Sequence, residues 1–279
     1  MIIVTGAKGQ LGGDVCDILA KQNAEYMGID ITDLDITDKK AISDFFDRVK
    51  ADALIHCAAY VAVDKAEEEK EQCFDVNEKA TANLAAECKK HNIKMLYIST
   101  DYVFEGNGET PFEPEDKKGP LGIYGLSKLK GEEAVSSNLD RFFIVRTSWV
   151  FGEKNTNFIA TMLRLAQTRD EVSIVSDQIG SPTYSKDLAC LLCDMIQTEK
   201  FGIYHATNEG FCSWAELAAF TFEKANKTIT VKPVTSEEYP TKAVRPKNSR
   251  LSKKCLTAAG FTRLPDWKDA VERYINNII

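Results

Sequence analysis

The chain begins MIIVTGAKGQLG (residues 1–12), and this opening gives the first indication of its fold class. The apolar run at 2–4 is rich in β-branched residues, as expected for a buried strand of a parallel sheet. Glycines then recur at every third position: Gly6 permits a tight turn, Gly9 lets the backbone approach a pyrophosphate, and Gly12 allows close packing of a helix on the strand. The spacing is a variant of the dinucleotide-binding fingerprint, although a bare glycine turn would look the same.

The residues around this turn predict how a dinucleotide would bind. A helix expected from about Gln10 to Lys21 would present its N-terminal amides to the phosphates. A strand expected at 26–30 ends in Asp30, which can accept hydrogen bonds from an adenosine ribose and disfavours a 2′-phosphate, unless it merely ends the strand as a turn former. Lys8 could pair with a 2′-phosphate, so the sequence favours NADH and leaves NADPH open.

The composition excludes several classes of protein. With 279 residues, 44% of them hydrophobic and 28% charged, the chain can bury a large core and is neither disordered nor fibrous. Its net charge of −7 argues against general nucleic-acid binding, and an anionic substrate would need a local basic patch. No apolar stretch reaches the length of a membrane span, and no basic-then-apolar leader precedes the first strand. We therefore expect a cytoplasmic protein that binds neither nucleic acid nor membrane.

The cysteines and histidines do not indicate a redox or metal centre. The eight cysteines are scattered through expected strands and helices of a chain that is large enough to fold without disulfides, so we expect reduced thiols. The CxxC formed by Cys190 and Cys193 lies in an apolar helical stretch and is typical of core packing. Because His56, His91 and His205 have no metal-ligand spacing, we expect no catalytic metal.

Strands and helices alternate through the first half of the chain. Apolar strands are expected at 53–58, 95–99 and 142–146, and helices at 42–49, 67–88 and 122–136. This alternation predicts an α/β fold built on a Rossmann-type doubly wound parallel sheet. Ligands of such sheets bind beyond the carboxyl ends of the strands. The polar segments 58–60, 100–101 and 147–149 are expected at that edge.

One expected helix carries a residue pair that indicates chemistry. Tyr124 and Lys128 lie four residues apart and would share a face of the helix. A nearby cation lowers the pKa of a tyrosine, and a phenol tuned toward neutrality can donate a proton to an oxygen that is becoming an alkoxide. The pair therefore predicts carbonyl reduction, with the hydride supplied by the dinucleotide. The alternative is a packed aromatic residue beside a surface lysine.

Seven motifs, in order along the chain, resemble those of one family. They are TGAKGQLG at 5–12, CAAYVAVDKAE at 57–67, STDYVFEG at 99–106, YGLSK at 124–128, RTSWVFG at 146–152, DQIGSPTYSKDLA at 177–189 and RPKNSRL at 245–251. Over its whole length the chain resembles the extended short-chain dehydrogenases/reductases, and more closely the dTDP-4-dehydrorhamnose reductase family.

The resemblance implies roles for residues in these motifs. Tyr124 would be the general acid toward the C4 carbonyl oxygen, Lys128 would bind the nicotinamide ribose and lower the tyrosine pKa, and Thr100 would orient the carbonyl. The expected cofactor-binding residues are Gly6, Lys8, Gly9, Gln10, Leu11, Gly12, Asp30, Ala58, Ala59, Tyr60, Tyr124 and Lys128. The expected substrate-binding residues are Thr100, Asp101, Tyr102, Trp149 and Arg245.

The parallel pattern weakens after about Val150. Expected elements there are an amphipathic helix at 155–168, strands at 172–175 and 204–206, and a helix that opens with the capping-box spacing of Ser213 and Glu216. The resemblance implies a dinucleotide-binding domain of 1–150 plus about 183–207, and a smaller, discontinuous C-terminal α/β substrate domain of about 151–182 and 208–279.

Two features of the second half indicate a nucleotide-sugar substrate. Residues 245–250 hold three cations, which predicts a diphosphate clamp, because arginine makes bidentate contacts, or else an exposed basic loop. Trp149 would stack near the sugar, as the resemblance implies, or else belong to the core, where aromatic residues usually lie.

The expected function is reduction of the C4 keto group of dTDP-4-dehydro-β-L-rhamnose to dTDP-L-rhamnose by NADH or NADPH, in polysaccharide synthesis. The alternatives are another nucleotide-sugar reductase or epimerase of the superfamily, or a regulatory subunit that resembles the β subunit of methionine adenosyltransferase. The residues Thr100, Tyr124 and Lys128 argue against a purely regulatory role. Some family members are described as magnesium-linked dimers; their acidic interface residues have no counterpart here, so a homodimer and a magnesium requirement stay open.

Overall fold

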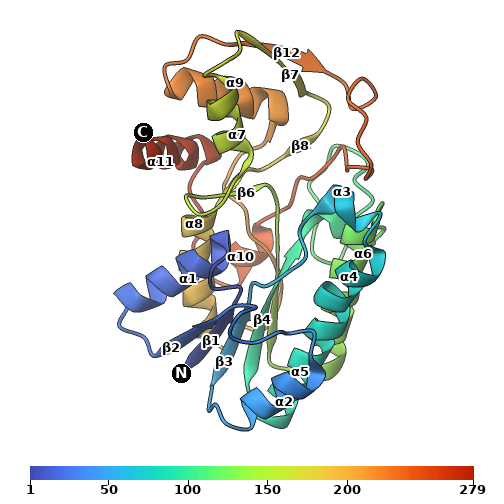
Figure 1. The fold of residues 1–279 in the computed structure, drawn as a ribbon, viewed down its shortest axis with the longest axis vertical. Coiled ribbons are helices and arrows are strands. Elements are labelled where there is room, and N and C mark those ends of the chain that lie inside the picture. Colours follow the sequence, from blue (N-terminus) through green and yellow to red (C-terminus); the bar gives the residue numbers. More distant parts are fainter.

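The computed structural model describes all 279 residues, Met1–Ile279. Its centre is a six-stranded parallel sheet in the order β10-β5-β4-β3-β1-β2 (Figure 1). The strands are β1 (Ile2–Thr5), β2 (Tyr26–Ile29), β3 (Ala53–His56), β4 (Lys94–Thr100), β5 (Phe142–Thr147) and β10 (Gly202–His205). The strand order reverses beside β1, so the expected doubly wound sheet is confirmed.

Helices cover both faces of this sheet and bury one core on each side (Figure 1). On one side lie α1 (Gln10–Lys21), α8 (Ser185–Ile196) and the short α10 (Lys254–Ala258). On the other lie α2 (Lys39–Phe46), α5 (Thr81–Lys90) and α6 (Ile123–Asn138). The free cysteine Cys193 is buried in the first core, as the packing interpretation of the CxxC requires, whereas Cys190 is exposed.

The single helix expected at 67–88 is wrong. The chain forms α3 (Val63–Ala66), α4 (Lys70–Phe74), a π-helical turn (Asp75–Ala80) and then α5. The π turn carries Asn77, whose side-chain amide accepts a hydrogen bond from the Tyr60 N–H at 2.9 Å and donates one to the Tyr60 carbonyl at 3.0 Å. π turns of this kind are frequent at functional sites, and here the turn anchors a loop at the carboxyl end of β3.

Two other helices begin where a capping side chain is available, and this shifts their expected bounds. The helix expected at 42–49 is α2, which starts three residues earlier because Asp38 accepts hydrogen bonds from the backbone N–H groups of Lys40 and Ala41. The helix expected at 155–168 is the shorter α7 (Phe158–Leu165), which Asn157 caps.

The C-terminal part builds a smaller layer beyond the carboxyl edge of the sheet (Figure 1). It contains α7, β7 (Glu171–Val175) paired in parallel with β12 (Thr230–Val234), α9 (Trp214–Lys224) and α11 (Trp267–Ile278). Two short ladders pair β6 (Val150–Phe151) with β9 (Thr183–Tyr184), and β8 (Ile179–Gly180) with β11 (Cys212–Ser213). The expected capping box of Ser213 and Glu216 is present at the start of α9. None of the helices combines the length and apolar character needed to cross a membrane.

Candidate functional site

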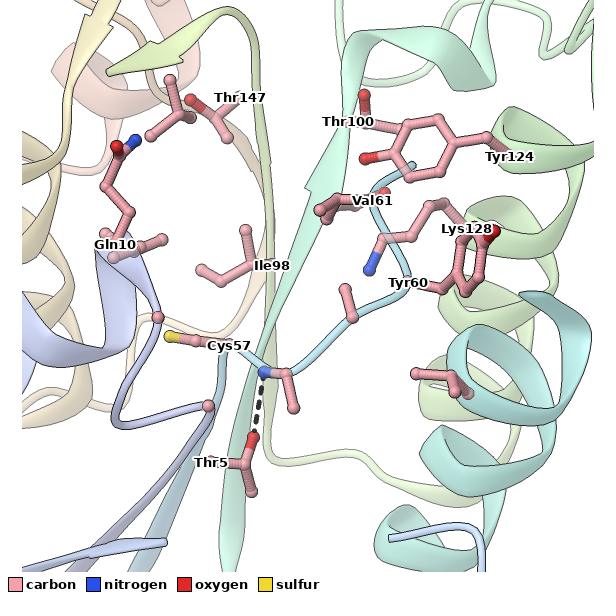
Figure 2. Close-up of a pocket in the computed structure, with 18 of the residues that line it drawn as sticks. Thr5, Gln10, Cys57, Tyr60, Val61, Ile98, Thr100, Tyr124, Lys128 and Thr147 are labelled. Carbon is pink, nitrogen blue, oxygen red and sulfur yellow. Dashed lines mark hydrogen bonds between the residues drawn. The ribbon is translucent and has the colours of Figure 1, made fainter. Parts of the chain in front are cut away.

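A cleft of about 940 Å³ opens at the carboxyl ends of the central strands, and residues of both the large sheet and the smaller layer line it. Fifteen of the expected site residues line it: Gly6, Lys8, Gly9, Gln10, Leu11, Asp30, Ala58, Ala59, Tyr60, Thr100, Asp101, Tyr102, Tyr124, Lys128 and Trp149. Two expected site residues, Gly12 and Arg245, do not line it. The structure therefore gathers residues from positions 6 to 149 into one cavity (Figure 2).

The glycine turn leaves no room for side chains. Gly6 has a φ of +68°, and a Cβ built on it would lie 2.8 Å from the backbone nitrogen of Ala58. A Cβ on Gly12 would lie 2.2 Å from the carbonyl oxygen of Gly6, so Gly12 serves the packing of α1 against the turn rather than the cleft wall. Thr5 adds a further contact, because its hydroxyl accepts a hydrogen bond from the Ala58 N–H at 3.2 Å (Figure 2). This open backbone cradle fits the phosphates of a dinucleotide.

Asp30 binds the glycine turn to the end of β2. Its carboxylate accepts hydrogen bonds from the backbone N–H groups of Lys8 at 2.8 Å and Ile31 at 2.9 Å. The Lys8 ammonium donates to the hydroxyl of Thr32 at 2.6 Å. A carboxylate, an ammonium and a hydroxyl thus lie together at the end of the cleft where the sequence predicts the adenosine ribose.

Tyr124 and Lys128 extend from the first turns of α6 into the same cavity, beside Thr100 at the end of β4 (Figure 2). Lys128 is only 2% exposed, and its ammonium lies 4.1 Å from the centroid of the Tyr97 ring. The shared helix face expected from the four-residue spacing is present.

The expected lowering of the Tyr124 pKa by Lys128 is not seen. Burial raises the pKa of the Tyr124 phenol, and the Thr100 hydroxyl opposes this shift without cancelling it. Burial also lowers the pKa of Lys128 to about 7, although Glu132 acts in the opposite direction. Removing both groups from water favours the neutral form of each, and this outweighs their mutual effect. Tyr124 is therefore a protonated phenol at neutral pH.

Polar contacts that the sequence did not indicate hold this helix in place. The Glu67 carboxylate accepts a hydrogen bond from the Ile123 N–H, the first amide of α6, at 2.8 Å. Asn77 donates to the hydroxyl of Ser127 at 3.0 Å, and that hydroxyl donates to the Tyr124 carbonyl at 2.8 Å. Glu67 and Asn77 both fall in the segment expected to form a single helix, 67–88. Their contacts depend on a loop and a π turn that no local pattern indicates.

Asp101 and Tyr102 extend the cavity beyond the three expected catalytic residues. Burial raises the pKa of Asp101 to about 6, and the Thr100 hydroxyl donates a hydrogen bond to its carboxylate at 3.0 Å. The Tyr102 ring packs edge-on against the Tyr124 ring, with 5.6 Å between the ring centroids.

Trp149 lines the cleft together with residues that sequence reasoning missed. Its indole is stacked on that of Trp214, with 3.6 Å between the centroids and 14° between the planes. Asn155 and Thr156 also line the cleft. Trp214 is the first residue of α9, 65 positions from Trp149, and only the capping-box spacing beside it was visible in the sequence.

Arg245 lies outside the cleft wall and is paired. Its guanidinium donates two hydrogen bonds to the Asp64 carboxylate, at 3.1 and 2.7 Å. It lies close enough to Tyr102 to oppose, through its charge, the burial that raises the pKa of that phenol. The other two cations of the expected clamp also have partners: Lys247 pairs with Asp177, and Arg250 donates to Asn248. The basic segment is therefore not a free patch.

The chain matches the family described as "RmlD substrate binding domain" over residues 1–279. It belongs to this RmlD family.

Similar proteins carry names that agree with this placement. The chain is 38% identical over 274 residues to the spore coat polysaccharide biosynthesis protein SpsK of Bacillus subtilis, covering 98% of this chain and 96% of that protein. It is 38% identical over 284 residues to a dTDP-4-dehydrorhamnose reductase of Aggregatibacter actinomycetemcomitans, covering 97% of each. The expected family and the expected class of enzyme, an oxidoreductase, are confirmed.

A solved structure shares the whole fold of this RmlD-family chain. The dTDP-4-dehydrorhamnose reductase of Bacillus anthracis, in complex with NADP, superposes with a TM-score of 0.96 at 39% sequence identity, covering 99% of this chain and 98% of that one. The Rossmann-type fold expected from the alternation of strands and helices is confirmed.

One group of side chains in this RmlD-family chain could share a metal ion, and it lies away from the cleft. Asp47, Glu87 and His91 approach one another near the C-terminal ends of α2 and α5, and none of them lines the cleft. The ammonium of Lys90 already lies 2.8 Å from the Asp47 carboxylate. The group therefore has no part in the chemistry of the cleft.

Proposed function

We propose that this protein reduces the C4 keto group of dTDP-4-dehydro-β-L-rhamnose to give dTDP-L-rhamnose, with NADPH or NADH as the hydride donor. The observation that carries the proposal is the meeting of a half-buried phenol, a hydroxyl and a glycine cradle in one cleft. The names of the similar proteins support the substrate, and SpsK supports a place in polysaccharide synthesis.

In this proposal, Tyr124 is the general acid. A bound nicotinamide dinucleotide would supply the hydride to the carbonyl carbon. Because burial raises the pKa of Tyr124, its phenol holds a proton at neutral pH and can donate it to the carbonyl oxygen as negative charge develops there. Thr100 is next to the phenol, and its hydroxyl, which donates to Asp101 in the free protein, would turn to donate a second hydrogen bond to the same oxygen. Lys128 would bind the ribose hydroxyls of the cofactor.

The cofactor-binding residues fit a nicotinamide dinucleotide and do not favour NADH alone. The Asp30 carboxylate is already engaged by two backbone N–H groups, so it is less available to select against a 2′-phosphate than the sequence indicated. Lys8 and Thr32 offer an ammonium and a hydroxyl beside it. The similar enzyme of B. anthracis was solved with NADP. We therefore set aside the expected preference for NADH and propose that the site accepts both cofactors.

The substrate would lie between the sheet and the smaller layer. We propose that the chain divides into two parts. Residues 1–150 and about 183–207 form the larger part, because β10 belongs to the large sheet and α8 packs on it. Residues about 151–182 and 208–279 form the smaller part, whose strands β7 and β12 lie outside that sheet. One element crosses this division: α10 of the second part packs on the core of the first. Asp101, Tyr102 and Trp149 would contact the sugar, with Arg245 behind Tyr102.

The test is oxidation of NADPH and NADH by the purified protein with enzymatically generated dTDP-4-dehydrorhamnose, with the product identified by NMR. Tyr124→Phe should reduce kcat by about a hundredfold or more, since general acid catalysis contributes roughly 10²–10⁴. Its Kd for NADPH should stay within about twofold of wild type, because the phenol contributes little binding energy of its own. Tyr26→Phe, which removes a hydroxyl far from the cleft, is the matched control.

The outcomes separate the alternatives. A different 6-deoxyhexose as product, or isomerisation without cofactor consumption, would assign the site to another nucleotide-sugar enzyme. Turnover that persists unchanged in Tyr124→Phe would remove the general-acid role.

A further inference from the structure

Trp149 has a backbone conformation that a bulky residue rarely adopts. Its φ is +49°, in the left-handed region. The other non-glycine residues with positive φ in this chain are all asparagines, which tolerate this region. Such conformations persist only where the surroundings hold them, and they gather at binding and catalytic sites.

Contacts from three segments hold this conformation. The Trp149 carbonyl accepts a hydrogen bond from the Thr183 N–H at 3.1 Å. Gly180 lies against the ring, since a Cβ built on it would be 2.8 Å from Trp149 Cε2. On the ring face, Trp214 stacks at 3.6 Å and is nearly parallel. The left-handed turn directs the indole into the cleft instead of continuing the strand from β5 into β6.

Trp214 is itself fixed. It is the first residue of α9, directly after Ser213, whose capping box with Glu216 sets the start of the helix. Phe158 packs against its indole with 4.7 Å between the centroids. Three aromatic rings therefore stand in a row, from Phe158 in the smaller layer to Trp149 in the cleft.

We propose that Trp214 is a positioning residue of the substrate site: it stacks on Trp149 and holds that indole as a preformed wall for the hexose ring of a dTDP-sugar. The inference rests on the proposed function, because it needs a sugar to be bound at this end of the cleft. An indole face binds the C–H groups of a hexose by dispersion and apolar burial. A wall fixed before binding adds affinity because no side chain has to be ordered when the sugar arrives.

The arrangement has a spectroscopic signature. The chain contains three tryptophans, and Trp267, the third, packs against Phe220 in the core of the smaller layer. Two stacked indoles couple their electronic transitions and give a pair of bands of opposite sign in the far-ultraviolet circular dichroism spectrum. No other two indoles of this chain stack on each other, so a couplet between indoles comes from Trp149 and Trp214.

The experiment compares Trp214→Ala, Trp214→Phe and the control Trp267→Phe with wild type. In Trp214→Ala the couplet should vanish, and KM for the dTDP-sugar should rise by about tenfold or more while Kd for NADPH stays within about twofold. Trp214→Phe should lose the couplet and yet recover KM to within about threefold, because a phenyl ring can still stack on Trp149. Trp267→Phe should keep both the couplet and the wild-type KM.

A wild-type KM in Trp214→Ala would overturn the proposal. So would a parallel loss of sugar and cofactor binding in that variant, since it would mean that Trp214 only supports the fold. A wild-type protein that does not turn over the dTDP-sugar would reject the proposed function instead. Two measurements need no turnover: the circular dichroism couplet, and the binding of dTDP-L-rhamnose measured by calorimetry. If Trp214→Ala loses both the couplet and the binding, the positioning role is still supported. If either one persists in that variant, the positioning role is refuted.

Discussion

Lys128 shows how burial changes the chemistry that a sequence motif indicates. Spacing predicts that Tyr124 and Lys128 share a face of α6, and both line the cleft. Spacing does not show that the lysine is 2% exposed, nor that its ammonium rests on the Tyr97 ring. Because desolvation lowers its pKa to about 7, its charge in the free protein depends on pH within the physiological range.

The affinity for the cofactor should therefore fall as pH rises through about 7. Below that pH Lys128 is an ammonium and can donate charged hydrogen bonds to ribose hydroxyls, and above it the amine is neutral. Hydrogen bonds to charged groups contribute roughly 1.5–3 kcal/mol, so Kd for NADH should rise by about tenfold or more between pH 6.5 and pH 9. NADH is the better probe, because it lacks the 2′-phosphate, which titrates near pH 6. Fluorescence titration at each pH gives the measurement.

Lys128→Met is the control for this pH profile. It should bind NADH weakly, with a Kd that is flat above neutral pH. If the Kd of this variant for NADH still changes with pH near 6, the group that titrates is Asp101, whose pKa burial raises to about 6. The nearby thiols Cys57 and Cys73 stay protonated, because burial raises their pKa values. If the wild-type Kd does not change with pH, Lys128 is not the group that binds the ribose.

At the scale of elements, helix α6 depends on a residue from outside it. Its N-cap, Gly122, has no side chain to offer, and the first amide donates to Glu67 from the loop after α3. Glu67→Ala should lower the free energy of unfolding by about 1 kcal/mol, the usual cost of losing an N-terminal cap, because the helix dipole also favours a negative charge there. Urea denaturation measures the change.

Glu71→Ala is the matched control for the cap. Glu71 is an exposed acid of the same region, and its carboxylate makes no hydrogen bond or ion pair. Its removal should change the free energy of unfolding by less than about 0.5 kcal/mol. Equal effects of the two substitutions would show that Glu67 acts only through the general charge of this acidic segment.

The bounds of the elements could be predicted where the signal is local. Helix α1 runs from Gln10 to Lys21 as expected, because a glycine turn fixes its start and a change of composition its end. The segment 67–88 was mispredicted because its π turn is set by Asn77 bonding to Tyr60, a contact between residues 17 positions apart. Helical periodicity carries no trace of such a contact.

At the scale of the molecule, the sequence predicted one end of the cleft better than the other. The residues expected to bind the dinucleotide come mostly from a strand, a turn and a helix that are consecutive in the chain, and all of them except Gly12 line the cleft. The proposed substrate end is lined by residues that follow β5 and by α9, and the segment after β12, residues 235–253, lies behind it; these parts meet only in the folded chain. Because these contacts join distant parts of the chain, the sequence carried no sign of Trp214, which lines the cleft. It also predicted a substrate contact for Arg245, which does not line the cleft.

Residues 242–245, in the segment after β12, are held to α3 and the loop after it by charged contacts. The Asp64 carboxylate accepts hydrogen bonds from the Ala243 N–H and from both terminal nitrogens of Arg245, and Lys242 pairs with Glu68. We call this set of contacts the 242–245 clasp. The Arg245 pair is bidentate and partly buried, which makes it stronger than an ordinary surface ion pair.

Breaking the clasp should loosen the substrate end of the cleft and leave the cofactor end intact. Asp64→Asn removes the charge opposite Arg245, so amide hydrogen exchange at 239–246 should accelerate. KM for the dTDP-sugar should rise by about tenfold, equivalent to roughly 1.4 kcal/mol, while Kd for NADPH is unchanged. Asp44→Asn, which breaks the exposed pair with Lys40 on α2, is the control and should change none of these quantities.

The direction of the change in KM decides what Asp64 does for Arg245. A guanidinium has five N–H donors, and Asp64 uses two of them, so Arg245 can be aimed by the carboxylate and still donate to a diphosphate. On that account the loss of Asp64 raises KM, because Arg245 is no longer held behind Tyr102. A lower KM in Asp64→Asn would mean that the carboxylate competes with the diphosphate for the guanidinium. An unchanged KM with faster exchange would place Arg245 outside the substrate site.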